Sequence, residues 1–140
     1  MSSAYKPIWV ILAVLCGAAA VAIVPKLTEK KELVVWGDNF PKALEAGKAR
    51  SKPVLVYVTA SWCGPCQEMK RSTLTDERVA AAIRDHFEAV KMDLDANREL
   101  AARLGASAIP FFAILNSEGN VVRSQVGYMS ADQMLGWLKG

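Results

Sequence analysis

The chain has 140 residues, which is enough for one domain with a single ordinary hydrophobic core. Its formal net charge of +3 at pH 7 is spread along the sequence without a basic block or stripe, which argues against a nucleic-acid-binding surface. The strongest compositional bias lies at the front, where residues 8–24 contain no charged or strongly polar side chain.

Residues 1–25 are predicted to form an N-terminal membrane anchor. The apolar stretch within them is at the short edge of the length needed for a transmembrane helix. Tyr5 and Trp9 stand where aromatic side chains anchor such a helix at the membrane surface. A cleaved signal segment, giving a secreted form, is the alternative, because Ala20, Val21 and Ala22 resemble a small-residue cleavage site.

The charges that flank this stretch give conflicting orientations. Lys26, Lys30 and Lys31 follow it and only Lys6 precedes it, which would place the C-terminal side in the cytoplasm. A short tail before an apolar stretch is, however, typical of export signals. We therefore expect the rest of the chain to lie outside the cytoplasm, in the periplasm.

The rest of the chain is predicted to be a short charged connector over residues 26–32 and one folded domain over residues 33–140. Apolar patterns and turn residues predict strands at 33–36, 54–60, 89–94, 111–115 and 120–126, the last two joined in a hairpin by the turn residues 116–119. Helices are predicted at 39–46, ended by Gly47, at 63–71, from Asp76, at 97–104 and from a capping box at Ser130 and Gln133. The continuous apolar run 54–60 is typical of a central strand covered on both faces. This order predicts an α/β fold with a central mixed sheet flanked by helices.

Two cysteines separated by two residues stand at the start of the predicted helix 63–71. Backbone N–H groups and the positive end of the helix dipole would lower the pKa of Cys63 and make it the nucleophile. Cys66, about one turn further on, is placed to resolve a mixed disulfide. Gly64 leaves the helix start uncrowded, and Pro65 lacks only an N–H that the first turn could not have paired.

A zinc site is one alternative for these cysteines. A closed site needs two more ligands, and outside the pair the chain offers only Cys16, within the apolar stretch, and the single His86. Two buried and unreactive cysteines are another alternative, against which the Gly-Pro insert and Trp62 argue. The sequence therefore favours a redox pair.

Over residues 33–140 the chain resembles the thioredoxin family. Residues 62–66, Trp-Cys-Gly-Pro-Cys, match the thioredoxin active site, and Ile109-Pro110 follows Cys66 by forty-four residues, just before a predicted strand. In that family this is the cis-proline loop, which lies beside the redox pair and binds the substrate chain. The resemblance implies a thioredoxin fold, a cis peptide bond at Pro110 and a substrate surface formed by Trp62, Gly64, Pro65, Ile109, Pro110 and Gly127.

One position departs from the family pattern. The family usually buries an aspartate six residues before the first cysteine, where it helps to move the proton of the second thiol, but here that position is Tyr57. A phenol with its ordinary pKa near 10 is a poor base at neutral pH. We therefore expect Lys91, Glu68 or water to serve this proton transfer.

The segments 52–54 and 73–76 resemble the C-terminal domain of DsbD-type membrane reductant carriers, and the Gly-Pro insert is similar to that of reducing thioredoxins. We therefore expect a monomeric, membrane-tethered reductase that acts on protein disulfides and receives electrons from an upstream donor. The Cys63–Cys66 disulfide would be its redox centre, with no metal or organic cofactor. A redox-inert thioredoxin-like module that holds a partner chain in the cis-proline groove is the competing hypothesis.

Overall fold

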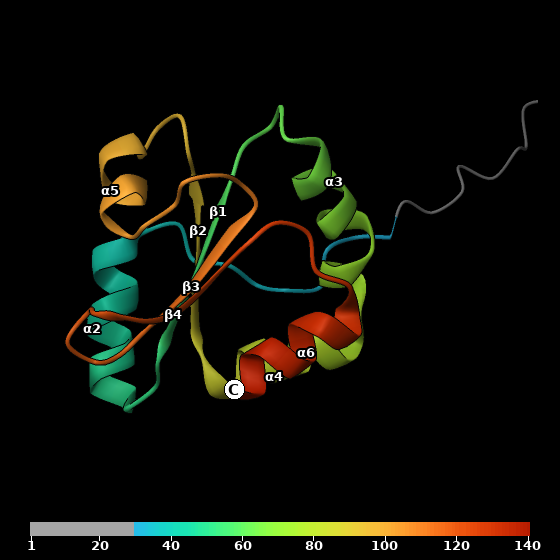
Figure 1. Ribbon diagram of the computed structural model, residues 1–140. Coiled ribbons are helices and arrows are strands. Elements are labelled where there is room, and N and C mark those ends of the chain that lie inside the picture. The colour runs from blue at the N-terminus through green and yellow to red at the C-terminus, as the bar shows by residue number, and fades with distance from the viewer. Residues whose placement is uncertain (1–29) are drawn as a thin grey trace, which may run out of the picture.

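The computed structural model describes residues 30–140, which form a four-stranded sheet with helices on both faces (Figure 1). The predicted α/β architecture is thereby confirmed. The helices are α2 (Phe40–Arg50), α3 (Gly64–Arg71), α4 (Glu77–His86), α5 (Arg98–Arg103) and α6 (Ala131–Lys139), with a 3-10 turn η1 (Thr73–Thr75). The strands are β1 (Val54–Thr59), β2 (Glu88–Asp93), β3 (Phe111–Leu115) and β4 (Val121–Val126).

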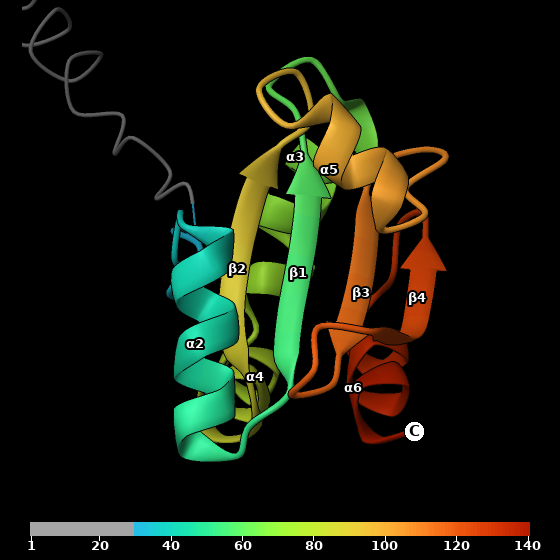
Figure 2. The ribbon, with the colours of Figure 1, turned by 90° about the vertical axis from the view of Figure 1, so that its left-hand side faces the viewer.

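The sheet is mixed and has the strand order β2-β1-β3-β4 (Figure 2). The central strand β1 runs parallel to β2 and antiparallel to β3, which in turn pairs antiparallel with β4. The predicted hairpin joins the last two strands, and the Asn116 side chain accepts hydrogen bonds from the N–H groups of Glu118 and Asn120. Helices α3, α4 and α6 cover one face, and α2 and α5 cover the other (Figure 1).

Alternating side chains of the central strands build two cores, one on each face. Leu55 and Tyr57 of β1 point to the face covered by α3, α4 and α6, whereas Val56 and Val58 point to the face covered by α2 and α5. This explains the continuous apolar run in β1, because both of its faces are buried. Met69 of α3 is fully buried in the first core and fixes that helix, so the N-terminus of α3 lies beside the end of β1.

The predicted strand 33–36 is wrong. These residues are not paired as a strand, and only Gly37 forms an isolated parallel bridge with Val90. Leu33, at the start of this stretch, is instead bound to η1, because its N–H donates to the Leu74 carbonyl at 2.9 Å. Val34 is buried and Val35 is almost fully exposed, so only part of this apolar run packs against the core.

Helix α2 does not end at Gly47, where the sequence predicted its end. It runs on to Arg50 and is closed by Ser51 in the left-handed conformation. Gly47 is instead needed for close packing, because a Cβ there would lie 2.8 Å from the Lys52 carbonyl oxygen and from a Val54 methyl group. The capping box that Ser130 and Gln133 predict is confirmed at α6.

The predicted anchor over residues 1–25 and most of the predicted connector lie outside the described residues. Within residues 30–140, no helix has the length and apolar character required to cross a membrane. The membrane anchor therefore stays a prediction.

Candidate active site

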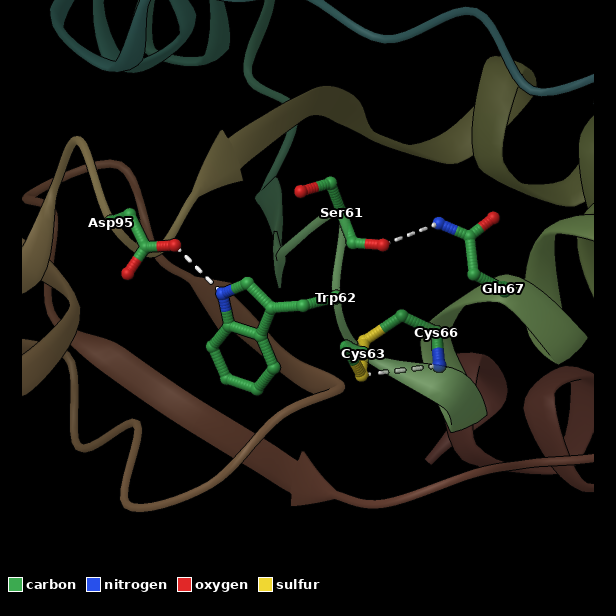
Figure 3. The surroundings of a disulfide bond; sticks show 6 residues. All are labelled: Ser61, Trp62, Cys63, Cys66, Gln67 and Asp95. Carbon is green, nitrogen blue, oxygen red and sulfur yellow. Dashed lines mark hydrogen bonds between the residues drawn. A yellow bond between two sulfur atoms is a disulfide. The ribbon is translucent and has the colours of Figure 1, made fainter.

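Cys63 and Cys66 are joined by a disulfide at the N-terminus of α3 (Figure 3). Cys63 is the N-cap residue, with extended backbone, and its Sγ accepts a hydrogen bond from the Cys66 N–H at 3.2 Å. The Gln67 N–H donates to the Cys63 carbonyl at 3.1 Å and starts the helical ladder. A backbone N–H that points at the sulfur of a helix N-cap cysteine is the arrangement that stabilises a thiolate at a helix start.

The disulfide lies in a small apolar cluster at one end of the sheet. Ala60, Cys63 and Cys66 are buried, and Leu94 and Ile109 pack against them. Gly64 and Pro65 are exposed beside the disulfide, and a Cβ at Gly64 would have nothing within 4 Å. The disulfide is therefore covered by apolar side chains, and the surface beside it is open at Gly64.

Trp62 presents an exposed indole next to the disulfide. Its side chain is 64% exposed, and its Nε1–H donates to Asp95 Oδ2 at 2.7 Å (Figure 3). This hydrogen bond, followed by the hydrogen bond and charge of Arg98, lowers the pKa of Asp95. The ring is thus held in one orientation from its polar edge, while its apolar face is available to a bound chain.

The loop before β3 supplies the second wall. The Ile109–Pro110 peptide bond is cis, as the resemblance implied, and Pro110 is buried. The Gly127 N–H donates to the Pro110 carbonyl at 2.8 Å, which joins the two loops. Gly127 has a φ of +97°, and a Cβ there would have nothing within 4 Å, so the backbone leaves open space at this point.

In the part of the chain that the structure describes, no three His, Cys, Asp or Glu side chains lie close enough together to hold a metal ion. The site instead combines a disulfide at a helix start, an exposed aromatic ring and a cis-proline loop. This combination can exchange a disulfide with a bound thiol-containing chain.

Comparisons with known proteins agree with this geometry. Residues 35–117 match the family described as thioredoxin-like. The chain belongs to the thioredoxin-like family. A thioredoxin from Alicyclobacillus acidocaldarius is 34% identical over 96 residues, which is 69% of this chain and 84% of the relative.

Two further relatives are disulfide-exchange proteins by name. The crystal structure of a disulphide isomerase from Xylella fastidiosa is similar with a TM-score of 0.63 and 32% identity, covering 71% of this chain and 85% of that protein. The thiol:disulfide interchange protein DsbD of Ralstonia nicotianae is 32% identical over 103 residues, which is 70% of this chain but only 17% of that longer protein. The chain is thus a thioredoxin-like thiol-disulfide oxidoreductase.

Tyr57 fills the position at which thioredoxin-like proteins usually carry a buried aspartate. It is 2% exposed, stacks on Phe112 with a ring-centroid distance of 4.4 Å and packs against Trp36 at 5.4 Å. Burial raises the pKa of Tyr57, and the negative charge of Glu32 raises it further, against a lowering by a hydrogen bond with Thr59. The phenol therefore stays protonated at neutral pH and acts as a core aromatic group.

Of the two residues predicted to relay the Cys66 proton, Lys91 and Glu68, only Lys91 borders the cavity next to Cys66. Lys91 borders the same open cavity as Cys66, of about 220 Å³. Glu68 does not border that cavity; it lies on the exposed side of α3 and forms a 3.3 Å ion pair with Arg71. Sequence reasoning missed Asp95, the partner of Trp62, and Glu32, which borders the cavity from the segment before α2. No sequence motif indicates a role for Glu32, because it is one of several charged residues in the predicted connector.

Proposed function

We propose that this protein is a reductase of protein disulfides that works outside the cytoplasm, tethered to the membrane by residues 1–25. The observation that carries the proposal is the Cys63–Cys66 disulfide at the start of α3, beside the exposed Trp62 ring and the cis-Pro110 loop. The Gly-Pro insert, which resembles that of reducing thioredoxins, supports the reducing direction. The likeness to a thiol:disulfide interchange protein supports a partner-fed role.

The proposed reaction moves two electrons from the dithiol to the substrate. The Cys63 thiolate attacks one sulfur of a substrate disulfide, and the other substrate sulfur leaves as a thiolate that takes up a proton. The Cys66 thiol then loses its proton and attacks Cys63, so that the Cys63–Cys66 bond forms and the second substrate thiol is released. Trp62, Ile109 and Pro110 would hold the substrate chain against the sulfur pair. An upstream dithiol donor returns the disulfide to the reduced state, with no metal or organic cofactor.

The reduction potential of the Cys63–Cys66 pair tests the direction of this reaction. Equilibration with glutathione or dithiothreitol buffers should give a value near that of reducing thioredoxins, about −270 mV. A value near about −120 mV, as in strongly oxidising relatives, would overturn the reducing assignment.

Insulin reduction by the native chain and by Cys63→Ser separates an enzyme from a binding module. We expect activity in the native protein and none in the variant. If neither protein reduces insulin while both bind the same protein chain, the groove is a redox-inert binding site. Flotation of the chain with lipid vesicles, compared with a chain that lacks residues 1–25, tests the tether.

A further inference from the structure

An acidic side chain from outside the predicted domain borders the cavity next to Cys66. Glu32 belongs to the extended segment that precedes α2, and its side chain is only 11% exposed. Glu32, Tyr57 and Cys66 line the open cavity of about 220 Å³. A carboxylate is therefore present beside the second thiol although the usual position for it carries a tyrosine.

Two side chains hold the Glu32 carboxylate in place. The Lys91 ammonium donates to Glu32 Oε2 at 3.2 Å, and the Trp36 indole N–H donates to Oε1. The segment itself is fixed on both sides, by the hydrogen bond from Leu33 N–H to the Leu74 carbonyl and by the bridge at Gly37. The charge of Lys91 opposes the repulsion that the carboxylate would exert on a nearby thiolate.

Three of the other titratable groups around this cavity are poor proton acceptors, and the fourth, Asp93, already accepts backbone hydrogen bonds. Tyr57 stays protonated. The ammonium groups of Lys70 and Lys91 have hydrogen-bond donors but no acceptor. Asp93 is exposed at the end of β2, and its Oδ1 accepts the N–H groups of Asp95 and Ala96 in the following loop.

The space between Cys66 and Glu32 suits a water-mediated transfer. A cavity of about 220 Å³ has room for several water molecules, at about 30 Å³ each. Glu32 and Lys91 also line a larger cavity of about 700 Å³ that opens at the surface. Glu32 therefore borders both the cavity next to Cys66 and a larger cavity at the surface.

We propose that Glu32 takes the proton of the Cys66 thiol, through water in this cavity, when Cys66 attacks the mixed disulfide at Cys63. This rests on the disulfide exchange proposed above. The Cys66 proton passes to Glu32, the Cys66 sulfur bonds to Cys63, and the bond between Cys63 and the substrate breaks with its electron pair on the substrate sulfur. That thiolate then takes up a proton from Glu32 or solvent. In the reverse direction, Glu32 returns the proton to Cys66 when a donor thiolate attacks Cys63.

The sign of the effect separates a proton relay from a nearby charge. A carboxylate that only lies close to Cys66 would repel its thiolate, so its removal would speed the attack of Cys66 at pH 7. If the carboxylate accepts the Cys66 proton, its removal slows the attack of Cys66, because only solvent is then left to accept that proton.

The experiment follows the two steps of one reaction with 5,5′-dithiobis(2-nitrobenzoate). All proteins carry Cys16→Ser, so that only Cys63 and Cys66 react. The reduced chain is mixed with the reagent in a stopped-flow instrument from pH 5 to pH 9. The first thionitrobenzoate released reports the attack of Cys63, and the second reports the attack of Cys66 on the mixed disulfide. The variants are Glu32→Gln, Glu32→Asp and, as a matched control on the exposed surface of α2, Glu45→Gln.

In Glu32→Gln we expect the second phase at pH 7 to slow by about tenfold or more, with the first phase changed less than about threefold. The rate of that phase should rise close to tenfold per pH unit in this variant, and much less steeply in the native protein. Glu32→Asp should recover part of the native rate, and Glu45→Gln should match the native protein.

Three results would overturn the relay. They are an unchanged second phase in Glu32→Gln, a faster one, or a native second phase that itself rises tenfold per pH unit. The last of these decides the question even if Glu32→Gln does not fold. A native protein that releases only the first equivalent would instead refute the proposed dithiol exchange, so the two failures are distinguishable.

Discussion

Thr73→Val should destabilise the fold by removing one buried hydroxyl without changing the volume of the side chain. Thr73 is 1% exposed in η1, directly after the helix that carries the cysteines, and its Oγ1–H donates to the Met129 carbonyl at 2.5 Å. Valine leaves that carbonyl without this partner in a buried site. Such a loss costs about 1–3 kcal/mol of the free energy of unfolding.

Urea unfolding of the native chain, Thr73→Val and Thr75→Val measures this difference. Thr75 is a matched control, because its hydroxyl donates to the carbonyls of Arg71 and Ser72 at a less buried place in the same turn. We expect Thr75→Val to change the unfolding free energy by less than about 0.5 kcal/mol, with similar m-values in all three proteins. Equal losses in the two variants, or a loss below about 0.5 kcal/mol in Thr73→Val, would refute the reasoning.

Three other changes test separate parts of the structure. Asp76 caps α4 by accepting the Arg78 N–H at 2.8 Å, so Asp76→Ala should lower the unfolding free energy by about 1 kcal/mol. The Arg78 side chain lowers the pKa of Asp76, so the charged part of this stabilisation is present above the unfolded pKa of about 4 and is lost as the pH falls through the lower folded value. Urea titrations at pH 7 and pH 3 should therefore show a smaller difference between native and Asp76→Ala at pH 3. Trp62→Ala should raise KM for insulin more than it lowers kcat, because we propose that the exposed ring holds the bound chain; an unchanged KM would contradict this. Gly127→Ala should cost about 1–2 kcal/mol, measured by thermal unfolding, because its φ of +97° strains any L side chain even though the space is open.

The parts of the site that the sequence predicts are those determined by short-range chemistry. The cysteine spacing and the proline place a redox pair at a helix start, and the disulfide is found there. The capping box at Ser130 and the Asn116–Gly119 hairpin depend on residues within four positions of each other. The apolar run of β1 is long enough to indicate burial on both faces without knowledge of its neighbours.

The parts that the sequence did not predict depend on contacts between residues that are far apart in the sequence. Residues 33–36 have a strand-like pattern, but the edge of β2 accepts only Gly37 and the segment turns to η1 instead. Gly47 locally indicates a helix terminator, whereas its role is to let α2 approach Val54. Glu32 belongs to no motif in the sequence, and its partner Lys91 lies 59 residues away, in β2.

Because of Glu32, the start of this domain differs according to whether it is defined by its strands and helices or by the groups that surround its cysteines. A fragment that begins at residue 33 would keep every described strand and helix, both active-site cysteines and the cis-Pro110 loop. It would also lose the carboxylate that binds Lys91 beside Cys66. Under the relay proposed above, such a fragment would still carry both cysteines but would resolve mixed disulfides slowly. Under that proposal the catalytic unit includes Glu32, which lies before the first described helix, α2.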